Sequence, residues 1–204
     1  MAQKEHILIG GAGLCGTLLA IRLAKRGYKV SLHERRKDMR QDTLDGGRSI
    51  NLALSDRGLK SLKLVGLDEV VRKECIPMNG RMIHSVAGEL RMSPYSGRQE
   101  EYINSVSRSG LNITLLNEAE KIENIDIIFE SKCMGVALEE GTAHFKTKTG
   151  ETQTVHADVI IGADGAGSIV RKSLMAKTTD LLFNYSHDFL RSGYKELTIP
   201  ATED

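Results

Sequence analysis

The stretch His6-Ile-Leu-Ile-Gly-Gly-Ala-Gly-Leu-Cys-Gly16 decides the fold of this 204-residue chain. It opens on a short, nearly continuous apolar run, which is typical of a strand buried on both faces of a parallel sheet. Apolar residues then recur at helical spacing as far as Ala24, and Gly27 is expected to end that helix. The alternating segment 28–33 predicts a second strand. Residues 4–34 are therefore predicted to form a β-α-β unit.

The glycines of this stretch follow the spacing Gly11-x-Gly13-x-x-Gly16, and each has a mechanical role. The first glycine allows the tight turn out of the strand, the second lets backbone N–H groups approach a pyrophosphate, and the third lets the helix pack against the strand. The helix N-terminus offers unpaired N–H groups to the phosphates. Glu34 follows Gly16 by eighteen residues, where it can accept hydrogen bonds from both ribose hydroxyls of an adenosine. The unit is thus predicted to bind a dinucleotide.

The rest of the chain is predicted to alternate between helices and strands, with two hairpins. Helices are expected at 56–71 with a break at Gly66, at 111–122 and at 168–175. Strands are expected at 126–129, 134–138, 158–161 and 193–199, and hairpins at 81–92 and 142–156. This order favours an α/β fold.

The charge balance excludes one class of partner. The chain holds 28 Lys and Arg against 27 Asp and Glu, a net charge of +1, which does not suit a nucleic-acid binder that relies on bulk charge. Between Arg22 and Arg40, however, eight basic residues stand against two acidic ones, a local balance of 8 − 2 = +6. This surplus either attracts an anionic dinucleotide or belongs to a solvated face.

The cysteines and histidines predict neither a disulfide framework nor a metal site. Cys15, Cys75 and Cys133 lie far apart without a C-x-x-C pair, and the six histidines lack metal-ligand spacing. Free thiols suit a reducing compartment. We see no basic segment followed by an apolar one at the start, and no apolar run near the ~20 residues of a membrane span. A cytoplasmic protein is expected.

A second motif, Gly162-Ala-Asp-Gly165, follows a predicted buried strand and precedes a predicted helix. Ser168 and Arg171 extend it to the pattern Asp-Gly-x-x-Ser-x-x-Arg. A plain NAD-binding domain requires no Asp-Gly here, although Asp-Gly also occurs in ordinary type I turns. The motif resembles the segment that lies against the cofactor in FAD enzymes of the aromatic-hydroxylase type.

Four further blocks resemble the kynurenine 3-monooxygenase family of FAD-dependent aromatic hydroxylases, in the same order and at similar spacing. They are Gly47-Arg-Ser-Ile-Asn-Leu-Ala-Leu-Ser55 with Arg57-Gly58, Arg81-Met-Ile-His84, Ser105-Val-Ser-Arg108 with Leu111-Asn112, and Gly193-Tyr-Lys-Glu-Leu-Thr-Ile-Pro200. The resemblance covers nearly the whole chain.

This resemblance implies a Rossmann-like FAD-binding domain of the three-layer, glutathione-reductase and aromatic-hydroxylase type. That domain is expected to be discontinuous, built from residues 1–72 and 101–178. Residues 73–100 and 179–204 are expected to begin a mixed β substrate domain. Members of the family are considerably longer, so we expect the chain to be an N-terminal portion that lacks the C-terminal half of the family fold.

The resemblance also implies which residues meet the ligands. The FAD contacts are expected to come from Gly11, Gly13, Cys15, Gly16, His33, Glu34, Arg35, Arg36, Ala53, Arg108, Cys133 and Asp164. Arg81 and Tyr95 are expected to hold the carboxylate of the substrate. That pair suits a carboxylate, because arginine offers a charged fork and a phenol adds a directional hydrogen bond.

The implied activity is hydroxylation of L-kynurenine to 3-hydroxykynurenine with NADPH and O2, in the tryptophan degradation that leads to quinolinate and NAD. The cofactor carries the hard chemistry, so no side chain is expected to act as catalytic acid, base or nucleophile. The portion present here is expected to bind FAD weakly and to turn over little kynurenine.

Two alternatives stay open. A simple NAD(P)-dependent dehydrogenase would explain the glycine loop and Glu34, but not Asp164-Gly165 or the family blocks. A non-catalytic FAD-type fold could instead bind another protein. The sequence leaves the oligomeric state undetermined.

Overall fold

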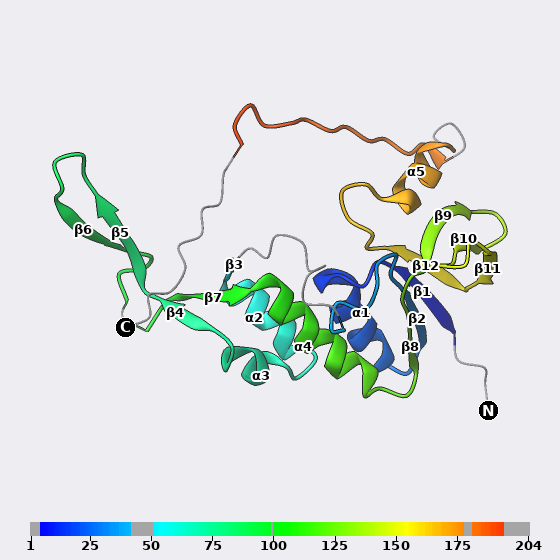
Figure 1. The fold of residues 1–204 in the computed structure, drawn as a ribbon, viewed down its shortest axis with the longest axis horizontal. Coiled ribbons are helices and arrows are strands. Elements are labelled where there is room, and N and C mark those ends of the chain that lie inside the picture. Colours follow the sequence, from blue (N-terminus) through cyan, green and yellow to red (C-terminus); the bar gives the residue numbers. More distant parts are fainter. Residues whose placement is uncertain (1–4, 42–50, 99, 178–180, 194–204) are drawn as a thin grey trace.

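The computed structural model of the protein describes residues 5–41, 51–98, 100–177 and 181–193. Its centre is a four-stranded parallel sheet in the order β12–β1–β2–β8 (Figure 1). The strands are β1 (His6–Gly10), β2 (Lys29–His33), β8 (Ile125–Ile128) and β12 (Val159–Gly162).

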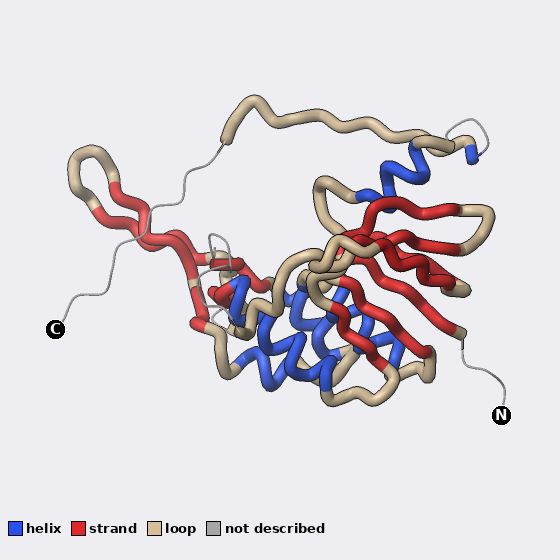
Figure 2. Tube along the Cα trace, turned by 45° about the vertical axis from the view of Figure 1, so that its right-hand side comes forward, coloured by secondary structure: helices blue, strands red, loops and turns tan. Residues whose placement is uncertain are grey.

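Two different layers cover the two faces of this sheet. Helices α1 (Leu14–Ala24) and α4 (Arg108–Glu120) share one core with Ile7 and Ile9 of β1. Leu8 points the opposite way, because successive side chains of a strand alternate between faces, and it packs in a second core. Most of the helices therefore lie on one side of the strands in Figure 2.

An antiparallel sheet in the order β11–β10–β9 forms that second layer, beside α5 (Ile169–Met175). Its strands are β9 (Lys132–Ala137), β10 (Thr142–Lys146) and β11 (Thr152–His156). Phe145 is fully buried between this layer and the parallel sheet. The predicted α/β class and its three layers are confirmed.

A separate group of strands extends from the other end of α4. Strands β3 (Asn51–Leu54), β7 (Ile103–Ser107) and β4 (Ile76–Met78) form an antiparallel sheet in that order. The hairpin of β5 (Gly80–His84) and β6 (Leu90–Pro94) projects beyond it, away from β1 and β12 (Figure 1). Helices α2 (Asp56–Lys63) and α3 (Asp68–Arg72) precede β4.

Most of the predicted elements are confirmed, including the break at Gly66, which has φ +72°. Helix α4 begins earlier than expected, at Arg108, because the Ser107 hydroxyl caps it by accepting from the Gly110 N–H at 3.2 Å. The β3–β7–β4 sheet was not predicted. The strand expected at 193–199 falls almost wholly outside the described residues. No helix in the described part of the chain could span a membrane.

The last residue of β2, His33, lies in the interior rather than at the surface. It is 4% exposed, its ring stacks on Phe145 with centroids 3.9 Å apart, and its Nδ1 lies 2.9 Å from Ser131 Oγ. Burial lowers the pKa of His33 to about 4, with a smaller contribution from the nearby His6. The folded protein therefore holds this ring neutral at physiological pH.

Acidification is expected to destabilise the protein through His33. The ordinary pKa of histidine is 6.5, and that of His33 in the folded protein is about 4. Between these two pH values His33 binds a proton in the unfolded chain but not in the folded protein, so the free energy of unfolding falls as pH falls. One proton allows a slope of up to about 1.4 kcal/mol per pH unit. Urea unfolding at pH 7, 5.5 and 4.5 measures this slope. His33→Gln should flatten it, and an equally steep slope in that variant would exclude His33 as the cause.

Candidate cofactor site

Three loops meet at the carboxyl edge of the parallel sheet, after β1, β2 and β12. The Gly11 N–H donates to the His33 carbonyl at 2.7 Å, and the Ala163 N–H donates to the Gly10 carbonyl at 2.8 Å. The chain leaves β1 in one direction to form β2, and β12 returns on the other side. Ligands of open α/β sheets bind at such a switch point, outside the carboxyl ends of the strands.

The three glycines of the loop meet different surroundings. A Cβ on Gly16 would lie 1.9 Å from the Gly11 carbonyl oxygen, and one on Gly11 would lie 2.5 Å from the Ala163 carbonyl oxygen. Gly11 also has φ +103°, which favours glycine. A Cβ on Gly13 would meet no atom within 4 Å among the residues that the structure describes. The fold itself requires Gly11 and Gly16, whereas Gly13 keeps the start of α1 open to a ligand.

Glu34 connects the β2 loop to the glycine loop. Its side chain is largely buried, and Oε2 accepts from the Ala12 N–H at 3.1 Å. Oε1 accepts from the backbone N–H of Arg36 at 3.0 Å and from its Nε at 2.9 Å. These donors hold the carboxylate beside the glycine loop, where a ribose hydroxyl could donate to it.

Asn112 of α4 holds the other side of the same peptide. Its Nδ2 donates to the Ala12 carbonyl at 3.1 Å, so Glu34 and Asn112 fix the amide planes on both sides of Ala12. Asn112 is buried, and its Oδ1 has no hydrogen-bond partner among the described residues. We did not predict Asn112 as a site residue. The sequence feature that could have indicated it is an amide side chain beside Leu111, on the apolar face of a predicted helix.

Asp164 supplies a second unpaired polar atom at this edge. Its Oδ2 accepts from the Ile169 N–H at 2.6 Å and so caps α5. Its Oδ1 is buried without a hydrogen-bond partner in the described part of the chain. Buried polar atoms almost always have partners. A ligand group that donates here would satisfy the oxygen, so these residues fit a polar cofactor at this edge.

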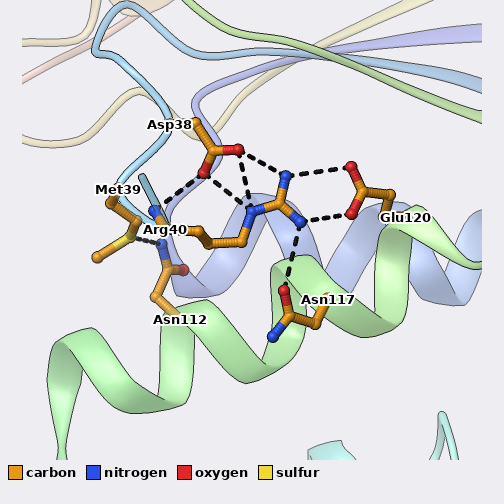
Figure 3. A network of polar contacts seen from close by, with 6 residues as sticks. All are labelled: Asp38, Met39, Arg40, Asn112, Asn117 and Glu120. Carbon is orange, nitrogen blue, oxygen red and sulfur yellow. Dashed lines mark hydrogen bonds and ion pairs between the residues drawn. The ribbon is translucent and has the colours of Figure 1, made fainter. Parts of the chain in front are cut away.

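A charged network ties the segment after β2 to helix α4 (Figure 3). Arg40 donates to Asp38 at 2.7 Å and to Glu120 at 2.7 Å, and also to Asn117. The hydrogen bond from Arg40 is the main cause that lowers the pKa of the Asp38 carboxyl. The network fixes the loop that follows Glu34 and Arg36.

Arg40→Lys should destabilise the protein by about 1 kcal/mol, because an ammonium cannot bridge both carboxylates with a planar fork. Urea unfolding at pH 7 measures the change. Lys60→Arg, on an exposed ion pair with Asp56, is the control and should change stability by less than about 0.5 kcal/mol. Equal stability of the Arg40→Lys variant and the parent would contradict the network's role.

The other residues expected to bind FAD lie around this edge or farther along the chain. Cys15 is exposed on the first turn of α1, Arg35 and Arg36 are exposed after β2, and Arg108 is exposed one helical turn before Asn112. Cys133 is half-buried in β9, where burial raises the pKa of its thiol and the charge of Asp164 adds to that rise. Ala53 lies in β3, opposite Ser105. The buried ring of His33 faces Phe145, so only its backbone borders the glycine loop.

Arg81 and Tyr95 lie together, but not beside the glycine loop. The Arg81 guanidinium lies 5.8 Å from the centroid of the Tyr95 ring, and both side chains are exposed. Arg81 lies in β5 and Tyr95 directly follows β6, and this hairpin is at the opposite end of the molecule from β12 (Figure 1). Within the described ranges, no three His, Cys, Asp or Glu side chains form a group that could hold a metal ion.

Sequence comparison matches residues 4–184 to a family described as an FAD binding domain. The chain is 46% identical over 202 residues to a kynurenine 3-monooxygenase of Myxococcus xanthus (strain DK1622), covering 98% of this chain and 43% of the relative. It is 42% identical over 199 residues to a kynurenine 3-monooxygenase of Drosophila melanogaster, covering 98% of this chain and 42% of the relative. The chain thus spans about two-fifths of the length of these curated relatives.

Solved structures of an oxygenase and a monooxygenase share the fold. A tetrameric form of 2-methyl-3-hydroxypyridine-5-carboxylic acid oxygenase aligns with a TM-score of 0.68 at 26% identity, covering 85% of this chain and 43% of that one. The p-nitrophenol 4-monooxygenase PnpA of Pseudomonas putida DLL-E4 aligns with a TM-score of 0.71 at 19% identity, covering 85% and 44%, which shows the fold alone. With its glycine loop, Glu34 and Asp164 gathered at one edge of a parallel sheet, the chain belongs to the FAD-binding domain family, and its curated relatives are kynurenine 3-monooxygenases.

Proposed function

We propose that this chain forms the FAD-binding part of a monooxygenase that converts L-kynurenine to 3-hydroxykynurenine with NADPH and O2. One observation carries the cofactor assignment. The amides on both sides of Ala12 are fixed by Glu34 and Asn112, next to Gly13, whose added Cβ would have no atom within 4 Å in the described part of the chain. A loop held this firmly, with one side left open, suits a rigid phosphate-bearing cofactor.

Different residues around the glycine loop are proposed to contact different parts of FAD. The backbone at Gly13, Cys15 and Gly16 presents the helix N-terminus to the pyrophosphate, with Gly11 making the turn. The Glu34 carboxylate accepts hydrogen bonds from the ribose hydroxyls. The unpaired oxygen of Asp164 accepts a hydrogen bond from a donor group of the cofactor. Further contacts are proposed from His33, Arg35, Arg36, Ala53, Arg108 and Cys133. When bound, FAD supplies the redox chemistry that activates O2.

Substrate binding is assigned to the projecting hairpin. Arg81 carries a permanent charge and Tyr95 a phenol, and the two side chains lie within cation–π distance of each other. We propose that they hold the substrate carboxylate, with residues 73–100 and 179–204 in the substrate domain and residues 1–72 and 101–178 in the FAD-binding domain. Three free cysteines suit a cytoplasmic location.

A flavin titration tests the cofactor assignment. Added FAD should lose fluorescence on binding the chain, and Glu34→Gln should weaken this binding at least tenfold, since an amide accepts poorly from two hydroxyls. Glu118→Gln makes the same change of charge at a half-buried position on α4 and should leave the affinity unchanged. Binding of NAD without binding of FAD would favour the simple dehydrogenase instead.

A second measurement tests the substrate. Kynurenine should shift the absorbance spectrum of bound flavin, measured in this chain and in a version extended to the length of its relatives. Arg81→Gln should weaken the shift at least tenfold, whereas Arg91→Gln, on the exposed partner strand of the same hairpin, should not. An Arg81→Gln variant of the extended protein in which every measured property is unchanged would favour the non-catalytic alternative.

A further inference from the structure

A basic cleft of about 350 Å³ opens beside the loop that follows Glu34. We define it by its six cationic side chains, which are Arg35, Arg36, Lys37, Lys132, Lys146 and Lys148. Among the described residues, Glu130 is the only acidic one that lines it, so the cleft carries a formal charge of 6 − 1 = +5. The whole chain carries +1, so this charge is a local concentration.

Backbone hydrogen bonds join the segments that carry these cations. The Glu130 N–H donates to the Arg36 carbonyl at 3.0 Å, and the Ser131 N–H donates to the Glu34 carbonyl at 2.9 Å. The loop after β2 is thereby fastened to the segment that enters β9. Strand β9 pairs in turn with β10, which carries Lys146 and leads to Lys148. The cleft is thus formed by segments that are far apart in sequence and tied together by ordinary backbone bonding.

Most of this charge lacks compensation. Lys148 lies 3.5 Å from Glu130, and Arg36 pairs with Glu34. No ion pair to a described carboxylate joins the remaining four cations, which are Arg35, Lys37, Lys132 and Lys146. Lys132 and Lys146 also lie directly opposite each other on adjacent strands. Like charges in such a cross-strand pair repel and destabilise the sheet.

We propose that the basic cleft binds a compact polyphosphate or phosphate group, at a site separate from the glycine loop. Phosphate concentrates several negative charges in a small volume, and it accepts both the arginine fork and the point charge of lysine. Binding relieves the repulsion between Lys132 and Lys146. Arg35 and Arg36 are shared with the proposed FAD contacts, so the proposal rests on the four lysines of the cleft, none of which is a proposed FAD contact.

Inorganic pyrophosphate is the probe. The melting temperature of the 204-residue chain is followed against pyrophosphate concentration, with ionic strength held constant by NaCl so that general screening does not change. A saturable rise is expected in the parent chain. The double variant K132Q/K146Q should raise the apparent dissociation constant at least tenfold. The matched double variant K63Q/K73Q removes the same charge from exposed positions near α2 and α3, and should respond like the parent.

A single charge reversal gives a second signature. Lys146→Glu should raise the melting temperature without any anion, because it turns a repulsive cross-strand pair into an attractive one, and it should abolish the pyrophosphate response. A response that survives in K132Q/K146Q would place the anion elsewhere, for example at the glycine loop, and would overturn the proposal. So would the absence of a saturable response in the parent chain.

Two sources could supply the phosphate, and a pair of nucleotides distinguishes them. NADPH and NADH differ only in a ribose phosphate. If NADPH raises the melting temperature at tenfold lower concentration than NADH, and K132Q/K146Q removes that difference, the cleft takes a nucleotide-borne phosphate. Equal effects of the two nucleotides, together with a pyrophosphate response that K132Q/K146Q removes, would assign it to free polyphosphate.

Discussion

Gly16→Ala is expected to destabilise the protein by about 3 kcal/mol or more, or to prevent folding altogether. Its Cβ would lie 1.9 Å from the Gly11 carbonyl oxygen and 3.2 Å from the Ala163 Cβ. Gly11 lies in the turn between β1 and α1 and Ala163 directly follows β12, so α1 must move away from the sheet. Overpacking of a well-packed interior costs about 1–3 kcal/mol and sometimes more, and here the obstacle is backbone. Urea unfolding followed by circular dichroism measures the loss.

Gly13→Ala is the matched control and separates folding from cofactor binding. The chemical change is identical, but this Cβ would meet no atom of the described residues within 4 Å. Stability should therefore stay within about 1 kcal/mol of the parent. The FAD dissociation constant should rise at least tenfold, because the new methyl stands where the pyrophosphate approaches the backbone. Unchanged FAD affinity in this variant would count against pyrophosphate binding at the loop.

Asn112→Leu is expected to lower FAD affinity at least tenfold and stability by about 2 kcal/mol. The Ala12 carbonyl would lose its only side-chain donor in the described structure and stay buried, which costs about 1–3 kcal/mol. The amide next to it would then be held by Glu34 alone and could turn away from the cofactor. Flavin fluorescence titration and urea unfolding give the two readouts.

Asn124→Leu provides the control for this second prediction. Its Nδ2 donates to the Ala24 carbonyl at 3.0 Å and also to the Tyr28 carbonyl, at the opposite end of α1. This substitution also removes a side-chain amide that donates to a backbone carbonyl, so a similar loss of stability is expected. The glycine loop, however, keeps all of its hydrogen bonds. FAD affinity should stay within about threefold of the parent. Equal losses of FAD affinity in the two variants would show that Asn112 acts only through general stability.

The β-α-β unit could be predicted from the sequence because its signals are local. An apolar run, a glycine spacing and a helical period lie within about thirty residues, and the structure places β1, α1 and β2 there. The β3–β7–β4 sheet could not be predicted in the same way. Strand β7 reads Ile-Asn-Ser-Val-Ser, and its polar residues hide the period of a strand whose partners lie far away in sequence.

Long-range packing also determines how candidate residues are oriented at the site. The ring of His33 stacks on Phe145, more than 100 residues later in the chain, while its carbonyl accepts from the Gly11 N–H. Asn112 contacts the glycine loop 100 residues earlier, a partnership that no local pattern encodes. The pairing of Arg81 with Tyr95 came from family resemblance. The sequence spacing of the glycines and Glu34 did predict that they lie close together, because the geometry of one strand-helix-strand unit fixes their relative positions.

The order of strands in the parallel sheet has a consequence for biosynthesis. The turn that carries the glycine loop packs against Ala163, and β1 pairs with Val159–Gly162 on one side. A ribosome must therefore make roughly four-fifths of these 204 residues before the first strand gains its second neighbour. Until then the closely packed turn between β1 and α1 lacks its contact with Ala163. A nascent chain could fold its first β-α-β unit early, but the edge of the parallel sheet that holds the glycine loop and Asp164 would be completed only when β12 emerges.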